Sequence, residues 1–172
     1  MSVEVRVDEA GQIQALINTH GRALVLFARQ FVVTHADAED AVQDAFTRYW
    51  PRRKQADDPV AFLYACVRTA ALDLARSARR ARQRDLHASH DEAFTFDHAA
   101  ETAELQRMIA QQLDALPADQ REVLIMKIWG ELTFEQIAAA LAISPNTAAS
   151  RYRYALEKLA AAWPTEVPDE RT

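Results

Sequence analysis

The sequence has little glycine, almost no cysteine and no long apolar run. Three glycines in 172 residues, with 49% hydrophobic and 26% charged residues, are typical of a mostly helical globular chain. The lone Cys66 excludes an intrachain disulfide and a thiolate metal site, and its apolar surroundings predict core packing. No apolar run approaches the roughly 18 residues that span a bilayer, and residues 1–11 alternate charge with valine, unlike a signal peptide. We therefore predict a cytoplasmic protein without membrane insertion.

Charge is distributed unevenly along the chain. Residues 1–86 hold 13 Lys/Arg against 11 Asp/Glu, net +2, whereas residues 87–172 hold 7 against 14, net −7. Six arginines lie in one short stretch whose only acid is Asp73: Arg68, Arg76, Arg79, Arg80, Arg82 and Arg84. The total of −5 therefore does not exclude a nucleic-acid partner, although such a run is also typical of a solvated helix face.

Apolar residues recur at helical spacing in three stretches of the N-terminal half. They predict a first helix over residues 13–33, a second that begins after an N-cap at Asp37 and stops at Pro51, and a third capped by Asp58 with Pro59 at its first position. The intervening segment PRRKQADDP is predicted to be a loop. The second helix carries polar residues largely outside its apolar stripe: Asp40, Gln43, Asp44 and Arg48.

The third predicted helix is both apolar and basic. At about 100° per residue, Arg68, Arg76 and Arg79 lie close together on its circumference, away from its apolar stripe. That stripe consists of Val60, Leu63, Tyr64, Val67, Ala71 and Leu74. The arginines therefore form one basic stripe. Trp50 and Tyr64 flank the loop, but large apolar residues of this kind are more often part of a core.

Periodicity fails between residues 87 and 100, where acids are spread through the segment, so we predict a flexible acidic linker there. Beyond it, Pro117 begins a helix that ends near Gly130. From Glu101 the chain carries an apolar set of its own, which predicts an independently folding unit. The set consists of Leu105, Ile109, Val123, Leu124, Ile128, Ile137, Leu141 and Leu159.

Two capping signals follow in close succession. Thr133 and Gln136 have the spacing of a capping box, and Ser144 with Pro145 begins another helix after a tight turn at Ala142 and Ile143. A short helix, a tight turn and a second helix are typical of a helix-turn-helix, whose second helix enters the major groove of DNA. A solvated αα-hairpin is the alternative.

The last helix has an apolar face and a polar face. The apolar face is predicted to hold Ala148, Tyr152, Ala155, Leu156 and Leu159. The opposite face and its flanks hold amide, hydroxyl and guanidinium groups, which can bind base edges and phosphates: Asn146, Thr147, Ser150, Arg151, Arg153 and Tyr154.

About residues 10 to 162 resemble the extracytoplasmic-function (ECF) sigma factors of RNA polymerase. DAEDAVQDAFTRYW at 37–50 resembles the region that docks on the polymerase clamp helices, and AFLYACVRTAALDLARSARR at 61–80 resembles the helix that meets the minus-ten promoter element. The most specific match is LPADQREVLIMKIWGELTFEQIAAALAISPNTAASRYRYALEKL at 116–159, which resembles the region that reads the minus-thirty-five element.

The resemblance implies an all-α fold of two small helical domains, with sigma region 2 at 1–86, the linker at 87–100, sigma region 4 at 101–163 and a tail at 164–172. It implies polymerase binding by Asp40, Gln43, Asp44 and Arg48, and minus-thirty-five binding by the polar residues of the last helix. The base-capturing loop falls on PRRKQADDP. Minus-ten binding is assigned to Arg52, Arg53, Lys54, Arg68, Arg76, Arg79 and Arg80. The expected partners are core RNA polymerase, promoter DNA and an anti-sigma factor, with no cofactor and no catalytic or metal site.

Five positions depart from the family pattern. Ala142 stands where glycine is common, and if its φ is positive the alanine costs on the order of 1 kcal/mol. Ala149 stands where many members carry Lys or Arg. Asn146, Thr69 and Phe62 replace a frequent Gly, Asn and Trp. These departures leave the promoter sequence open.

Two other classes of protein compete with this interpretation. A stand-alone helix-turn-helix repressor explains the last helix equally well but not the pairing of an acidic-faced helix with an arginine stripe. An enzyme would depend on His87, His90, Asp91 and His98 as a metal cluster, yet these residues lie in the segment without periodicity, which favours solvated linker residues over metal ligands. No phosphate loop, nucleophile elbow or paired-carboxylate motif occurs, so we predict that the protein is not an enzyme.

Overall fold

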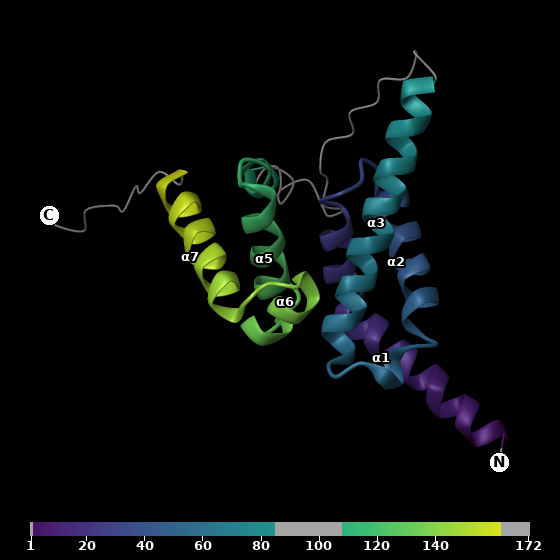
Figure 1. The fold of residues 1–172 in the computed structure, drawn as a ribbon. Helices are drawn as coiled ribbons and strands as arrows, with labels where there is room; N and C mark the ends of the chain where they lie inside the picture. The colour runs from purple at the N-terminus through teal and green to yellow at the C-terminus, as the bar shows by residue number, and fades with distance from the viewer. Residues whose placement is uncertain (1, 85–107, 163–172) are drawn as a thin grey trace, which may run out of the picture.

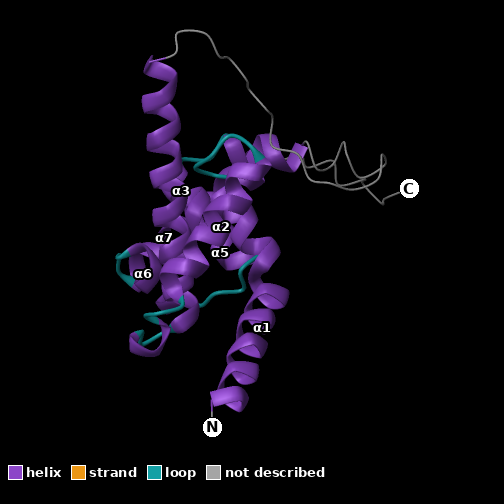
Figure 2. Cartoon of the chain, turned by 90° about the vertical axis from the view of Figure 1, so that its right-hand side faces the viewer, coloured by secondary structure: helices purple, strands orange, loops and turns teal. Residues whose placement is uncertain are grey.

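The computed structural model describes residues 2–84 and 108–162, and that part of the chain consists of helices joined by short turns and loops (Figure 1). The N-terminal unit contains α1 (Ser2–Ala28), α2 (His35–Tyr49), a short 3-10 helix η1 (Arg53–Gln55) and α3 (Pro59–Arg84). Residues 108–114 are also helical, and α5 (Ala118–Ile128), α6 (Phe134–Leu141) and α7 (Pro145–Ala162) follow. No strand occurs in these two ranges, as Figure 2 shows, so the predicted all-α class is confirmed.

The first helix differs from its predicted bounds of 13–33. It extends from Ser2, before the apolar stripe on which the prediction was based, and it ends at Ala28 in a tight turn. In that turn the Phe31 N–H donates to the Ala28 carbonyl at 3.0 Å, and the buried Arg29 guanidinium donates to the Val33 carbonyl. Local hydrogen bonds therefore replace the last predicted turn of helix.

The second helix begins at His35, so the predicted N-cap at Asp37 is wrong. Thr34 is the cap: its backbone is extended, and its hydroxyl accepts the Asp37 N–H at 3.0 Å. Asp37 lies in the first turn, where its negative charge suits the positive end of the helix dipole. The cap of α3 is as predicted, because the Asp58 Oδ1 atom accepts the Ala61 N–H at 2.8 Å and Pro59 is the first helical residue.

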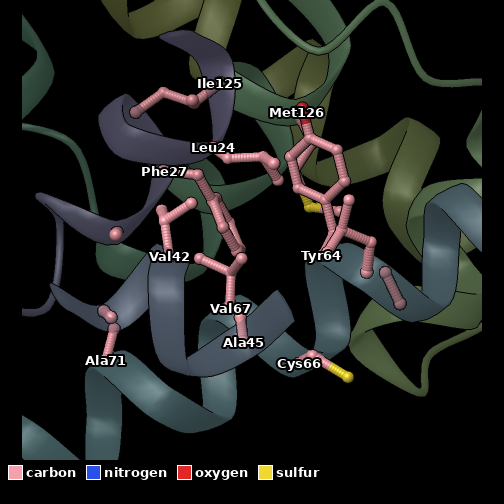
Figure 3. Close-up of a cluster of buried hydrophobic side chains, with 14 of the residues drawn as sticks. Leu24, Phe27, Val42, Ala45, Tyr64, Cys66, Val67, Ala71, Ile125 and Met126 are labelled. Carbon is pink, nitrogen blue, oxygen red and sulfur yellow. The ribbon is translucent and has the colours of Figure 1, made fainter. Parts of the chain in front are cut away.

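A buried cluster joins α1, α2 and α3. Tyr64, Leu63 and Val67 of α3 are fully buried against Leu24 and Phe27 of α1, and α2 contributes Val42 and Ala45 (Figure 3). The Phe27 and Tyr64 rings meet edge to face at 5.5 Å. Cys66 is buried as a free thiol, as its apolar surroundings predict.

The same cluster continues into the C-terminal unit. Ile125 and Met126 of α5, Leu132 of the following turn and Ile137 of α6 are buried in it together with Leu24 and Tyr64. Val123 and Ile137, predicted to serve the C-terminal unit alone, therefore belong to a core that both units share. A second, smaller cluster is internal to the C-terminal unit and consists of Leu113, Leu116, Leu124 and Ala155, with Ile109, Tyr152 and Leu159 packed against it.

Two apolar predictions for the C-terminal unit are wrong. Ile128 is 44% exposed at the end of α5, and Leu156 is 40% exposed on α7, because the apolar stripe of each helix is narrower than the sequence pattern indicates. The predicted domain boundaries stay predictions, since the linker at 87–100, Leu105 and the tail at 164–172 lie outside the described residues.

Candidate nucleic-acid and protein interfaces

The helix-turn-helix forms from the predicted signals. The Thr133 hydroxyl accepts the Gln136 N–H at 3.2 Å while the Gln136 side chain accepts the Thr133 N–H at 3.0 Å, which completes the capping box of α6. Ala142 then adopts the left-handed conformation, with φ 55° and ψ 46°. The Ser144 hydroxyl accepts the Thr147 N–H at 3.0 Å and caps α7. Two local caps and one left-handed residue thus fix the angle between the two helices.

The recognition helix α7 presents four of its six predicted residues to solvent. Asn146, Thr147, Arg153 and Tyr154 are exposed, and the Arg153 guanidinium lies 5.0 Å from the Tyr154 ring centroid. Ala148 and Ala155 are buried on the opposite face. Asn146 and Thr147 lie in the first turn of α7, and Arg153 and Tyr154 lie near its middle, where the Arg153 Nε atom is also 3.7 Å from the Glu157 Oε1 atom.

The other two predicted residues of α7 are partly engaged within the unit. The Arg151 Nε atom lies 3.1 Å from the Asp119 Oδ2 atom of α5, and the Ser150 hydroxyl donates to the Asn146 carbonyl at 2.8 Å. Both side chains are half-buried. Arg151 would have to exchange Asp119 for a phosphate before it could contact DNA.

Three of the predicted arginines line the C-terminal half of α3. Arg76, Arg79 and Arg80 are exposed. The C-terminal end of α3 extends beyond the other helices (Figure 1). Arg76 also lies 3.0 Å from Asp73, whose pKa is lowered chiefly by its hydrogen bond from Arg48 and further by Arg76. This end of α3 offers positive charge that a phosphate backbone can reach.

Arg68 lies apart from these arginines. Its Nε atom donates to the Glu122 Oε2 atom at 2.8 Å and its Nη2 atom to Oε1 at 3.3 Å, so the guanidinium holds both carboxylate oxygens of a residue of α5. Glu122 is only 7% exposed. The structure therefore does not group Arg68 with the exposed arginines of the stripe.

The predicted loop at 51–59 contains η1 and presents Arg52 and Lys54 to solvent. The guanidinium carbon of Arg53 lies 3.3 Å from the Trp50 ring centroid, so the arginine covers one face of the partly buried indole. Tyr64 is fully buried, as expected for a core residue, and burial raises the pKa of its hydroxyl. Of the two aromatic residues that flank the loop, only Trp50 is near solvent.

The polar face of α2 is present as predicted. Asp40, Gln43 and Asp44 are exposed, whereas Arg48 is half-buried between two carboxylates. Arg48 lies 2.7 Å from Asp44 and 2.9 Å from Asp73 of α3. The face is therefore acidic at its start and neutralised by an ion pair at its end.

Sequence reasoning missed Glu122 and Gln136 as residues that join the two units. Glu122 contacts Arg68, and the Gln136 Nε2 atom donates to the Asp58 Oδ2 atom at 3.0 Å. One signal was present: Glu122 is a carboxylate directly before the apolar run at 123–126, where a buried charge needs a partner. Gln136 carried no such signal, because its capping role already explains it.

Other site types find no support in the part of the chain that the structure describes. No group of His, Cys, Asp or Glu within it is arranged to hold a metal ion. His87, His90, Asp91 and His98 lie outside the described residues. Among the helices of that part, none combines the length and the apolar character needed to cross a bilayer.

An exposed recognition helix, capped as in a helix-turn-helix, and a second unit with an arginine-rich helix define a DNA-binding protein of the helix-turn-helix class. Residues 16–81 match the family described as Sigma-70 region 2, and residues 106–159 match Sigma-70, region 4. The chain is 31% identical over 159 residues to the ECF RNA polymerase sigma factor SigL of Mycobacterium tuberculosis, covering 88% of each chain. It belongs to the ECF sigma factors, which direct RNA polymerase to promoters at transcription initiation.

Two solved structures are similar across both units. The sigma factor RpoE of Bartonella quintana, solved in complex with the anti-sigma factor NepR, matches with a TM-score of 0.69 and 26% identity, covering 88% of this chain and 95% of that one. CnrH, solved in complex with the cytosolic domain of CnrY, matches with a TM-score of 0.58 and 27% identity, covering 87% and 85%. The presence of both sigma regions excludes the stand-alone repressor.

Proposed function

We propose that this sigma factor acts through three separate surfaces, one for core RNA polymerase and two for promoter DNA. The observation that carries the proposal is the exposed polar surface of α7 at the end of a fully capped helix-turn-helix. In this proposal the protein performs no catalysis of its own and works by binding alone. Since it acts on polymerase and DNA, we place it in the cytoplasm.

The minus-thirty-five element is assigned to α7. Asn146 and Arg153 offer an amide and a guanidinium, which can form paired hydrogen bonds with base edges in the major groove. Thr147 and Tyr154, together with Ser150 and Arg151, complete the surface with groups suited to phosphate contacts. The buried alanines on the opposite face support this orientation.

The minus-ten element is assigned to the exposed arginines of α3 and to the loop. Separation of the two DNA strands at the minus-ten element requires a protein that holds one DNA strand by its phosphates and accepts its unstacked bases. Arg76, Arg79 and Arg80 supply positive charge. The loop adds Arg52, Arg53 and Lys54 beside the indole of Trp50, and an aromatic face of this kind can stack a base.

Core polymerase is assigned to the polar face of α2, where Asp40, Gln43, Asp44 and Arg48 lie. Its apolar stripe is buried in the core, so only this face is available to a partner. We also propose an anti-sigma partner, because one of the two similar structures was solved with a protein of that kind. The binding surface for that partner is not assigned.

Run-off transcription with core polymerase over a genomic promoter library tests the proposed function. We expect transcripts that require the added protein. A variant with Asn146→Ala and Arg153→Ala should lose them selectively at promoters whose upstream element it no longer recognises. Core polymerase alone is the control, and no protein-dependent transcript from any promoter would contradict the proposal.

A further inference from the structure

One face of the Trp50 indole is covered by an arginine of the loop that follows it. The guanidinium carbon of Arg53 lies 3.3 Å from the ring centroid, well inside the roughly 6 Å that defines a cation–π pair. The indole itself is partly buried and packs against the core cluster. A base that stacked directly on this face of Trp50 would therefore have to displace Arg53.

Arg53 is held in this position through both its backbone and its side chain. It is the first residue of the 3-10 helix η1, in which the Ala56 N–H donates to the Arg53 carbonyl at 3.4 Å. Its Nη1 atom donates to the Trp50 carbonyl. A guanidinium is also more weakly hydrated than an ammonium group, which favours contact with a ring. The arginine plane is therefore fixed on the indole before any ligand binds, so little side-chain entropy remains to be lost on binding.

A guanidinium that lies on an indole still has a second face. Arg53 is half-buried, so part of its side chain reaches solvent, and the neighbouring Arg52 and Lys54 are exposed. Unpaired bases stack on arginine planes as well as on aromatic rings, and this stacking depends little on which base is present. The two exposed cations can contact the phosphates on either side of such a base.

We propose that Arg53 is the residue on which the loop stacks an unpaired base of the minus-ten element, with the indole of Trp50 beneath it. This inference rests on the proposed function and makes it more specific, because it gives Arg53 a role that its positive charge alone does not supply. The base forms the outer layer of a stack whose inner layers are the guanidinium and the indole. Such a surface favours any base over a missing base and reads no particular sequence.

Two substitutions separate the flat shape of Arg53 from its charge. Arg53→Lys keeps the positive charge and loses the plane, whereas Arg53→Phe keeps a flat face beside the indole and loses the charge. A stacking role predicts that the phenylalanine variant still distinguishes a base from a missing base and that the lysine variant does not. A role in phosphate binding instead predicts that the lysine variant behaves as the parent. Arg52→Lys, at the adjacent exposed arginine, is the matched control.

The probes are a short fluorescein-labelled oligo-dA and a labelled strand of the same length made of abasic residues, which has the phosphates but no bases. Fluorescence anisotropy measures the affinity of the holoenzyme for each probe, with core polymerase alone as the background. We expect the parent to prefer oligo-dA, and Arg53→Lys to reduce that preference by about 5-fold or more with little change in affinity for the abasic probe. Arg53→Phe and Arg52→Lys should keep the preference of the parent.

The outcomes distinguish the stacking role of Arg53 from the proposed function. If Arg53→Lys keeps the preference of the parent, Arg53 is a phosphate contact, and the stacking role is overturned while the minus-ten assignment stands. Loss of the preference in both Arg53 variants would mean that the arginine only maintains the loop, and would also overturn it. If the holoenzyme binds neither probe more tightly than core polymerase alone, the minus-ten assignment fails together with the stacking role.

Discussion

Ala142 occupies a backbone conformation that favours glycine. Its φ of 55° brings the Cβ atom close to the backbone, at a cost of about 1 kcal/mol relative to glycine. We predict that Ala142→Gly raises the free energy of unfolding by about that amount, measured by urea denaturation. Ala139→Gly, in the middle of α6, should lower it by about 1 kcal/mol. Equal effects of the two substitutions would contradict this account.

His20 makes stability depend on pH. It lies edge-on to Tyr64 at 6.2 Å, and burial lowers its pKa, with Glu131 opposing that effect. The unfolded chain therefore takes up the proton first, so stability is retained above the ordinary value of about 6.5 and falls as the pH drops below it. We predict a smaller loss between pH 7.5 and pH 5.5 for His20→Gln in urea titrations. Parallel losses in parent and variant would refute a role for this imidazole.

At the scale of single elements, α2 carries the surface assigned to polymerase. We predict that Asp40→Lys weakens binding to core polymerase, because it reverses a charge on the exposed face while the apolar stripe stays intact. Affinity should be measured by fluorescence anisotropy and folding by circular dichroism. Glu39→Lys, one residue away on the same helix, is the charge-matched control and should have a smaller effect. If both substitutions weaken binding equally, the docking face is misassigned.

The exposed end of α3 should contribute salt-dependent affinity. Replacing both Arg76 and Arg79 by alanine removes up to two phosphate contacts, so the salt slope of promoter binding by the holoenzyme should flatten by roughly one to two units. Arg76 is paired with Asp73, so we expect Arg79→Ala alone to account for more of the change than Arg76→Ala alone. An unchanged slope with normal polymerase affinity would mean that these arginines form only a solvated face.

Helix starts were predictable where the signal is local. Asp58, Ser144 and the Thr133–Gln136 capping box were all identified from sequence, because a cap involves residues at most three positions apart. The end of α1 was not predictable in this way, since the turn that follows it depends on the hydrogen bond from the buried Arg29 guanidinium to the Val33 carbonyl. The N-cap of α2 was predicted at Asp37, but the cap is Thr34, a residue type equally suited to capping that the prediction did not consider.

At the scale of the whole molecule, the shared core should couple the stability of the two units. Met126 lies in α5 but packs with residues of α1 and α3, so Met126→Ala should cost about 2 to 5 kcal/mol of unfolding free energy. Hydrogen exchange should become faster in α1 and α3 as well as in α5. Met108→Ala removes the same groups from an exposed site and should change stability by less than about 0.5 kcal/mol. Faster exchange confined to α5 would argue against a shared core.

The contacts between the units could not be predicted from sequence. Helical periodicity identifies which residues are buried but not what covers them, so Val123 and Ile137 were assigned to the core of their own unit. The exposed recognition surface of α7 was predictable, because residues on the face opposite the apolar stripe remain exposed to solvent. Helical spacing alone placed Arg68 in the basic stripe. Its ion pair with Glu122 depends on the tertiary structure and could not be read from the spacing.

The ion pairs between α2 and α3 have a consequence for how this protein can evolve. Asp44, Arg48, Asp73 and Arg76 form one chain of ion pairs that starts on the face assigned to polymerase and ends on the helix assigned to DNA. Loss of Asp73 would remove the carboxylate that Arg48 and Arg76 share. A genetic defect on one face can therefore be suppressed by a second change on the other. A substitution of Arg76 that favours a new promoter would therefore also affect the polar face of α2, which must still bind core RNA polymerase.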